Sequence, residues 1–392
     1  MLSESNFHNF NIALTTFLII LIITIIPIDR LSFLDPIGQA LNDFELYDLA
    51  FSKFNEDGTA DTNIVIVNIG RNNRKNIAEQ LKIISGHNPA VIGVDIIFNE
   101  LSDSNNDFTL RDAIIKTSSI VLASRIEEDD TDAESIRLIE SHPFFSENTE
   151  HGYVNLPDDN NSSFRTVRSF QPMIENHSSF GVKIASLYDS SIISKLSERD
   201  EEESTINFRG NYSKFYFIDE HQLFDTSIDF SFIEGKIVLL GFVNSSKIDF
   251  SFEDIFFTPM NERYVGKTFP DMNGVVIHAN IISMLLNNNF IEEMSFFWEV
   301  LFSFLLVFIN VIIIRQIQAK YGAWNDTITN IFLVLQSILY LFIILFVFNE
   351  YKYKISILSA QTGIFIITIA IDIYELYILR IVHQLKLRLR KQ

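Results

Sequence analysis

Three side chains in the middle of the chain have the chemistry to bind a ligand or to move a proton. Asp95 ends an apolar segment that predicts a buried strand, and Asp249 follows the apolar segment 236–241. His278 lies in the segment 274–286, where the apolar spacing predicts a helix, and an imidazole titrates near neutral pH. Carboxylates at the carboxyl ends of parallel strands line the crevice in which such sheets bind ligands. The three residues are therefore one candidate cluster.

Each of these residues also has a structural interpretation. His278 could be a core or capping histidine that bonds the backbone, and Asp95 could cap the helix that follows it. A sensory switch or a ligand contact at His278, near Asp249, is the functional alternative. Catalysis by all three residues together is a further hypothesis, which their replacement by alanine would test.

The sequence lacks the motifs of common enzyme and cofactor sites. No G-x-G-x-x-G follows the first predicted strand, and neither a P-loop, a G-x-S-x-G nor an H-E-x-x-H occurs. The loop 158–162 is only loosely similar to a calcium loop, because it has no glycine and Ser169 stands where glutamate is required; an Asx-rich turn fits it better. The absence of cysteine excludes disulfides and thiolate metal sites. We therefore expect no enzyme, no metal and no cofactor.

The elements that would position the candidate residues alternate between strand and helix. Apolar, β-branched runs joined by helices predict an α/β domain with a mainly parallel sheet, covered on both faces and with right-handed crossovers. The acidic stretches 126–150 and 197–204 predict loops and turns, and Leu110, Ile114 and Ile115 are expected to face the core. The predicted strands are 63–70, 90–98, 120–123, 206–209 and 236–241, and the predicted helices are 74–85, 108–117, 179–188 and 274–286.

Charge and hydropathy are separated along the chain. Hydrophobic residues make up 47% of the 392 residues, yet Asp and Glu number 50 against 30 Lys and Arg. Residues 29–293 carry 44 acids and 21 bases, and most of the apolar runs lie outside this range. This pattern predicts an acidic folded domain attached to membrane segments. A general nucleic-acid binder would need a basic surface, so we expect no nucleic-acid partner.

Four apolar segments are candidates for transmembrane helices. A hydrocarbon core of about 30 Å needs roughly 20 helical residues, a length that the second and third segments reach. The first lacks the basic start and the small residues of a cleaved signal peptide, so we expect it to remain as an anchor. The segments are 12–28, 294–314, 328–348 and 355–371, and the last continues to about Val382.

Basic residues give the predicted orientation. Arg315 and Lys320 lie between the second and third segments, and five further bases lie near or beyond the end of the fourth, so both regions should face the cytoplasm. With four spans, both termini are then cytoplasmic. The predicted domains are an anchor (1–28), an extracytoplasmic α/β domain (29–293), a three-helix transmembrane region (294–382) and a short basic cytoplasmic tail (383–392).

Polar residues inside the predicted spans are few. Asn310, Gln336 and Gln361 are expected to hydrogen-bond one helix to another rather than to line a pore. The basic tail, 383–392, is expected to hold anionic lipid headgroups, and docking of an acidic partner is the alternative.

Short blocks between residues 44 and 290 are informative through their order and spacing. They are FELYDLAF (44–51), IVIVNIG (64–70), AVIGVDIIF (90–98), VLAS (121–124), GYVNLPDD (152–159), GKIVLLG (235–241) and GVVIHANII (274–282), with Arg74, Ala78, Leu81, Arg165, Asp249, Thr258 and Pro259. Together they resemble the CHASE-type-2 (CHASE2) family, the extracellular sensory domains of bacterial signalling proteins. Asn68 departs from the family, whose members tend to have an aspartate there, and the loop before Arg74 is short.

The resemblance implies a sensory domain between one N-terminal and three C-terminal spans, the layout that hydropathy predicts independently. Arg74 and Arg165 belong to the matching blocks and join Asp95, Asp249 and His278 as candidate ligand-binding residues. Family members typically carry a kinase or cyclase after the last span, but only about ten residues follow that span in this sequence. Output is therefore expected to pass through a separate protein.

Two functions from different classes follow from these observations. The first is an inner-membrane sensory subunit whose periplasmic domain senses a ligand or an envelope partner. The second is a structural or assembly component of an envelope complex, with the domain as an interaction module. The expected partners are membrane lipid, a separate cytoplasmic or membrane effector protein, and further subunits of a homo- or hetero-oligomer.

Overall fold

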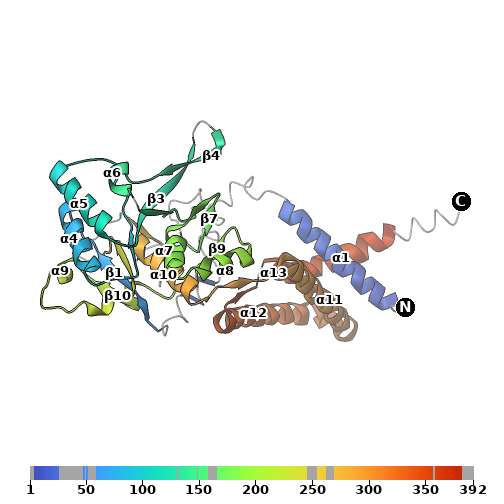
Figure 1. Ribbon diagram of the computed structural model, residues 1–392. Coiled ribbons are helices and arrows are strands. Elements are labelled where there is room, and N and C mark those ends of the chain that lie inside the picture. Colours follow the sequence, from blue (N-terminus) through green and yellow to red (C-terminus); the bar gives the residue numbers. More distant parts are fainter. Residues whose placement is uncertain are drawn as a thin grey trace. The chain divides into compact units, whose positions relative to one another are not determined.

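The chain folds into two compact units. The computed structural model describes residues 4–25, 47–48, 50–51, 59–129, 132–147, 149–157, 166–244, 254–261, 269–355 and 358–381. Residues 39–291 form an α/β unit, and residues 1–38 together with 292–392 form a helical unit (Figure 1). The acid-rich middle of the sequence therefore lies in the α/β unit.

A seven-stranded sheet is the centre of the α/β unit. Its strands are β1 (Asp61–Asn68), β2 (Val91–Val94), β3 (Ile120–Asp129), β4 (Asp132–Ile139), β5 (Glu150–Tyr153), β10 (Phe215–Ile218) and β11 (Ile237–Gly241). The strand order is β10-β1-β11-β2-β3-β4, with β5 also paired to β3. Every pairing is parallel except β3 with β4. The predicted α/β fold with a mainly parallel sheet is confirmed.

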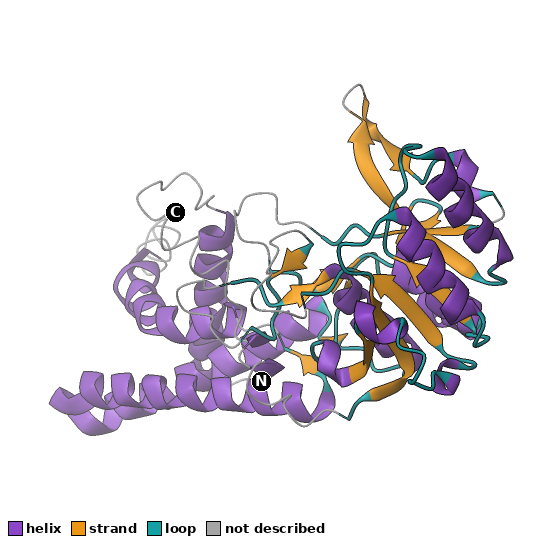
Figure 2. Cartoon of the chain, turned by 90° about the vertical axis from the view of Figure 1, so that its left-hand side faces the viewer, coloured by secondary structure: helices purple, strands orange, loops and turns teal. Residues whose placement is uncertain are grey.

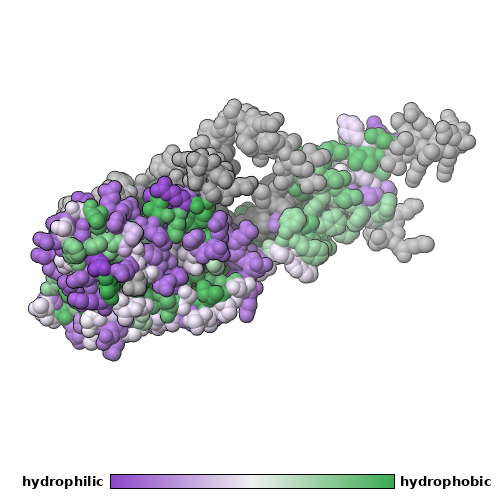
Figure 3. All heavy atoms as spheres, turned by 45° about the horizontal axis from the view of Figure 1, so that its top comes forward, coloured by the Kyte–Doolittle hydropathy of each residue, from purple (hydrophilic) through white to green (hydrophobic). Residues whose placement is uncertain are grey.

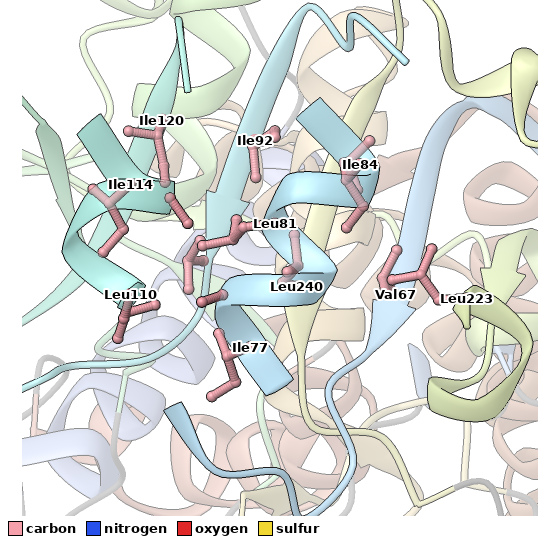
Figure 4. Close-up of a cluster of buried hydrophobic side chains, with 14 of the residues drawn as sticks. Val67, Ile77, Leu81, Ile84, Ile92, Leu110, Ile114, Ile120, Leu223 and Leu240 are labelled. Atoms are coloured by element: carbon pink, nitrogen blue, oxygen red, sulfur yellow. The ribbon is translucent and has the colours of Figure 1, made fainter. Parts of the chain in front are cut away.

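Helices cover both faces of this sheet. The helices of the α/β unit are α4 (Arg74–Ser85), α5 (Ser104–Lys116), α6 (Pro143–Ser146), α7 (Phe180–Tyr188), α8 (Ser191–Arg199), α9 (Glu220–Leu223) and α10 (Gly274–Leu286), of which α4, α5, α7 and α10 cover the sheet. Apolar side chains of α4 and α5 pack on β1, β2, β3 and β11 (Figure 4), while α7 and α10 pack on the opposite face. Short strand pairs complete the unit: β6 (Ser169–Phe170) with β9 (Ser204–Thr205), β7 (Met173–Ile174) with β8 (His177–Ser178), and β12 (Ile255–Phe256) with β13 (Met272–Asn273).

The helices α4 and α10 have the bounds that the sequence predicts. In α4, the side chain of Asn73 caps the first turn by accepting the N–H of Asn76, and one apolar face is buried. The helix α10 is buried on nearly every side, so its sequence is apolar all round. The predicted helix 179–188 is confirmed as α7.

Two predicted strands differ from the structure. The predicted strand 90–98 ends at Val94, because the next residues leave the sheet and the N–H of Phe98 bonds the Ser141 hydroxyl instead of a strand. The predicted strand 206–209 is wrong. The backbone N–H of Arg209 bonds the side chain of Asn280 on α10, whereas a strand not predicted, β10, joins the sheet edge.

The prediction of an acidic loop over 126–150 is also wrong. Most of this stretch is a hairpin of β3 and β4, followed by α6 and the start of β5, and the hairpin extends beyond the sheet (Figure 2). Opposite charges and apolar residues face each other across it, with Glu127 opposite Arg137 and Ile126 opposite Leu138. Because the stretch contains many acids, its alternating strand pattern was not recognised in the sequence.

Two helix boundaries differ from those that the sequence predicts. The helix α5 starts at Ser104 rather than at 108, because the Asp103 side chain accepts the N–H of Asn105 as a cap. Within it, Leu110 and Ile114 are buried as predicted, but Ile115 is 42% exposed. The predicted acidic turn 197–204 starts inside α8, which ends at a left-handed Asp200.

The helical unit contains α1 (Glu4–Ile25), α11 (Phe296–Tyr321), α12 (Asn325–Tyr351) and α13 (Leu358–Ile373), which continues into a π-helical turn at Tyr374–Ile378. The helices α11 and α12 are antiparallel neighbours: Gln336 Nε2 donates to Asn310 Oδ1 at 2.9 Å, and the rings of Phe302 and Tyr340 stack. Two short strands, β14 (Glu292–Glu293) and β15 (Tyr353–Lys354), pair beside the start of α11 and the end of α12.

The predicted helix-to-helix amide bond is confirmed for Asn310 with Gln336. The side chain of Gln361 lies outside the described residues. One continuous helical stretch, Phe296–Tyr351, is long and apolar enough to cross a membrane, and the antiparallel contacts divide it into α11 and α12. The described apolar part of α1, Phe7–Ile20, is shorter. Four transmembrane helices therefore remain a prediction.

Candidate functional site

The carboxyl edge of the sheet contains a topological switch point between β2 and β11. The chain after β2 leads to α5 on one face, whereas the chain after β11 leads to α10 on the other face (Figure 1). Adjacent strands whose connections leave to opposite faces create a crevice outside their carboxyl ends, where α/β proteins bind ligands. Asp95, the residue after β2, lies at this crevice.

Asp95 lies near a second carboxylate, Asp254, at the first turn of α10. The N–H of Asp95 donates to the carbonyl of Leu240 at 2.8 Å, which holds the residue at the end of β2. Asp254 has a φ of 52°, and a Cβ at Gly274 would lie 2.6 Å from one of its carboxylate oxygens. Glycine at position 274 therefore makes room for this carboxylate.

The two carboxyl groups affect each other's protonation. Burial raises the pKa of Asp95 well above its ordinary value, and the charge of Asp254 raises it further. Burial also raises the pKa of Asp254 to about 7, although the Gly274 N–H favours its charged form. One side of Asp254 is open to solvent, so protons can exchange with water. The pair is therefore partly protonated near pH 7.

Asn68 organises the neighbouring strand end. Its amide nitrogen donates to Asp219 at 2.9 Å and to the carbonyl of Val243 at 3.0 Å, and its oxygen accepts from the N–H groups of Gly70 and Val243. An aspartate could accept but could not donate, and it would repel Asp219. Asparagine at position 68 thus fits the surroundings that the structure gives it.

His278 is a core residue rather than part of the carboxylate pair. It is 3% exposed, and its ring packs edge-to-face on Phe180, with ring centres 5.3 Å apart. Burial lowers its pKa to about 4. Its Nδ1 has no hydrogen-bond partner among the described residues, and no described bond joins it to Asp95. Asp249 and Arg165 lie outside the described residues, so the predicted cluster is not assembled by the described contacts.

Arg74 joins the first turn of α4 to the segment before α5. Its Nη1 donates to Asp107 Oδ1 and its Nη2 to the carbonyl of Glu100, both at 2.5 Å. The guanidinium also lies against the rings of Phe98 and Phe145. Burial alone would raise the pKa of Asp107, but the bonds from Arg74 and from a backbone N–H hold it below its ordinary value.

A cavity of about 410 Å³ opens beside Arg74, on the α4 and α5 side of the sheet edge. Its floor is apolar, and its walls carry amide, hydroxyl and carboxylate groups. Such an arrangement suits a small ligand with one polar end, because the polar groups orient it and the apolar surface binds it. The lining residues are Asn72, Asn73, Arg74, Ile77, Ile96, Ile97, Phe98, Ser102, Asp103 and Asn106.

A comparison with known protein families shows which family the chain belongs to. A family model described as the CHASE2 domain matches residues 16–314. The chain belongs to the CHASE2 family. The match begins within α1, includes the entire α/β unit and ends within α11. No curated protein and no solved structure matches the chain.

The family is one of sensory domains, and its sequence blocks meet at the crevice of this CHASE2 domain. Asp95 comes from the block 90–98, and Gly274 starts the block 274–282. Their shared position at the carboxyl edge of the sheet makes that edge the candidate sensory site of the CHASE2 domain.

Sequence reasoning missed two acids of this site, Asp254 and Asp107. Asp254 lies in the same acidic segment as the predicted Asp249, but nothing local distinguishes one from the other. Asp107 is 2% exposed because Arg74, 33 residues earlier, covers it. The only signal in the sequence was that Asp107 directly precedes the predicted helix 108–117.

Proposed function

We propose that this chain is a sensory subunit of a bacterial inner membrane. In this proposal the CHASE2 domain lies outside the cytoplasm, the helical unit crosses the membrane, and a separate protein carries the output. Membership in a family of sensory domains supports the sensing role. The observation that carries the proposal is the course of α10, whose first turn meets the acidic pair and whose end is separated from α11 by only nine residues, 287–295.

The contacts of α10 favour its motion as a rigid rod. Asn280 is fully buried and uses its amide to bond the segment around Gly210. Ser283 and Asn287 both donate to Asp61 at the start of β1. A helix that is bonded along its length shifts as one body when its first turn moves. Because the connection from α10 to α11 is short, such a shift would be passed on to α11.

The surface of the helical unit supports a place in the membrane. Its visible face is largely hydrophobic, whereas the α/β unit shows mixed polarity (Figure 3). Along α12, side chains such as Leu335, Leu339 and Phe342 are about 60% exposed or more. In water such a surface would be costly, whereas lipid solvates it.

Aromatic residues lie at both ends of the α11–α12 pair. Trp298 and Tyr351 are exposed near one end, and Tyr321 and Trp324 are exposed near the other. At 1.5 Å per residue, the 26 residues of α11 span about 39 Å. This length and the two aromatic bands suit a bilayer with a core of about 30 Å and headgroups on each side.

Polar contacts gather three helix ends at one end of the helical unit. His8 Nδ1 lies 3.1 Å from Tyr374 Oη, and Arg315 Nη1 donates to Asn9 Oδ1 at 2.6 Å. The start of α1, the end of α11 and the end of α13 therefore meet. The presence of Arg315 and Lys320 there supports a cytoplasmic location for this end, under the positive-inside rule.

Photo-crosslinking tests the proposed output. A photoreactive residue replaces Tyr377, which is 65% exposed beyond the end of α13, or, as a control, Leu339 in the middle of α12. We expect a specific protein adduct at the first position and only lipid adducts at the second. Adduct yield should change when Asp254→Asn alters the acidic pair. Lipid adducts alone at both positions would contradict a separate effector.

An assembly component of an envelope complex is the second candidate. The β3–β4 hairpin supports it, because this ribbon extends beyond the sheet and offers the outer edge of β4 to a partner (Figure 2). An adduct from position 377 whose yield is the same with and without Asp254→Asn would favour assembly over sensing.

A further inference from the structure

The segment that follows α10 is fixed within the α/β unit. The carbonyl of Asn289 accepts from Asn207 Nδ2 at 3.0 Å. The ring of Phe290 packs against the guanidinium of Arg199, with 4.3 Å between the ring centre and Cζ. Ile291, the next residue, is 2% exposed. These contacts hold the chain as far as the last residue of the α/β unit, so a displacement of α10 is not lost in the residues that follow it.

The next residues are bonded to the connection between α12 and α13. Residues 292–294 run parallel to residues 352–354, and the two segments together form a clasp. The N–H of Glu292 donates to the carbonyl of Lys352 at 2.9 Å, and a second bond of 3.0 Å is donated by the N–H of Met294. The clasp begins at the first residue after the α/β unit, so no loop separates that unit from the clasp.

The second segment of the clasp leads directly into α13. Lys352 ends α12 with a left-handed φ of 51°, which turns the chain out of that helix. Lys354 Nζ lies 3.3 Å from Glu293 Oε1, which adds an ion pair to the two backbone bonds. Only three residues, 355–357, separate the clasp from Leu358, the first residue of α13. The clasp therefore connects the end of α10 to α13 by a route that does not include α11.

We propose that the clasp transmits a displacement of α10 directly to α13. The two segments move together, because separating them would leave backbone N–H and carbonyl groups unpaired at the membrane. The continuation of α13 contains Tyr374, whose hydroxyl contacts His8 and Asn11 of α1, and the exposed Tyr377. The proposal rests on the proposed sensory function and deepens it, since it states how the acidic pair regulates the end of the chain where the effector binds.

A distance measurement between two spin labels tests the proposal on the full-length chain in lipid nanodiscs. The chain has no cysteine, so the labels are attached at Ile331→Cys on α12 and at Tyr377→Cys, positions that are 56% and 65% exposed. We expect Asp254→Asn to shift the distance distribution by about 2 Å, because it changes the acidic pair at the first turn of α10.

Two changes interrupt the route through the clasp and leave α11 unaltered. A triglycine insertion after Ile355 keeps the clasp bonds but loosens their connection to α13. The same insertion after Gly322, between α11 and α12, is the matched control, since no atom lies within 4 Å of a Cβ there. Met294→Pro removes one donor of the clasp, whereas Met294→Ala keeps it. The insertion after Ile355 and Met294→Pro should each abolish the shift, and both controls should retain it.

The insertion after Ile355 decides the test by itself if Met294→Pro does not fold. A shift that survives this insertion would show that the displacement travels through α11, and it would overturn the inference. The absence of any shift with Asp254→Asn in the otherwise native chain would overturn it as well.

The photo-crosslinking at position 377 tests the proposed function separately. A clasp-dependent shift without a protein adduct would support the clasp and refute the separate effector. An Asp254-dependent adduct with a shift that does not need the clasp would refute the clasp alone.

Discussion

His278 illustrates how a buried group makes stability depend on pH. Its folded-state pKa of about 4 is lower than the ordinary value of 6.5, because burial disfavours the charged ring. The stabilising contribution of the neutral ring is therefore fully present above pH 6.5, and it is lost as the pH falls towards 4.

We predict that His278→Leu removes this dependence. Between pH 6.5 and pH 4 the native chain should lose up to about 3 kcal/mol relative to the variant, since the unfolded state binds a proton that the folded state excludes. Thermal unfolding in detergent at pH 4.5, 5.5 and 7 measures the difference. Parallel pH profiles for the native chain and the variant would refute this account of the buried ring.

Asp254 gives the stability of the fold a pH dependence of opposite sign to that from His278. Its folded-state pKa of about 7 is raised, so its contribution to stability is present below pH 4 and is lost as the pH rises to 7. Asp254→Asn, which tolerates the positive φ, should therefore stabilise the domain at pH 8 by on the order of 1 kcal/mol, with no gain at pH 4. The small value reflects the water that reaches this side chain.

Unfolding curves of Asp254→Asn at pH 4 and pH 8 measure this effect, with Glu198→Gln on the exposed face of α8 as the control. A gain that is the same at both pH values would show that the burial of the Asp254 charge is not its source.

The sequence predicted part of the site. Asp95 could be found because it follows an apolar strand pattern, and Arg74 because it belongs to the sequence blocks that resemble the CHASE2 family. The pairing of Asp95 with Asp254 could not be found, since the two are 159 positions apart and meet only through the strand order of the sheet. His278 lies on the predicted helix, but its neighbour Phe180 comes from another helix.

At the scale of elements, close backbone contact joins α7 to the sheet. A Cβ at Gly152 in β5 would lie 2.6 Å from the Cα of Phe180, the first residue of α7. Backbone cannot yield as a side chain can, so Gly152→Ala should cost about 1–3 kcal/mol. Thermal unfolding measures the cost.

Gly235 supplies the matched control for this prediction. No atom lies within 4 Å of a Cβ placed there, and its φ of 69° is one that asparagine tolerates. Gly235→Asn should therefore change stability by less than about 1 kcal/mol. If Gly152→Ala is equally mild, α7 does not pack against β5 as closely as the structure has it.

The amide bond between α11 and α12 makes a prediction for the helical unit. Asn310→Leu leaves the half-buried Gln336 without its partner, and Gln336→Leu does the same to the buried Asn310. Each single substitution should therefore cost about 1 kcal/mol, whereas the double substitution should cost less than the sum. Unfolding by a denaturing detergent measures this double-mutant cycle. Additive effects would contradict a direct bond between the two side chains.

Elements with one strong local signal were predictable, and elements specified by distant partners were not. The apolar spacing and the Asn73 cap define α4, and the long apolar run defines α10. The β3–β4 hairpin and β10 have weaker local patterns, and they form because a partner strand is present. The strand β2 ends earlier than predicted because hydrogen bonds from other segments, rather than its own sequence, determine where the chain leaves the sheet.

For the whole molecule, the central idea is a division of labour. In the proposed function, the acidic CHASE2 domain detects a condition outside the cytoplasm, and the apolar helices carry the response inwards. The contacts among α1, α11 and α13 place three helix ends together within the helical unit.

Cysteine labelling in intact cells with a permeabilised outer membrane tests this claim most directly, because the chain contains no cysteine of its own. A membrane-impermeant maleimide should label Asp112→Cys in the CHASE2 domain, and it should label Lys320→Cys, at the end of α11, only after the inner membrane is opened. Labelling of Lys320→Cys from outside, with protection of Asp112→Cys, would contradict the account.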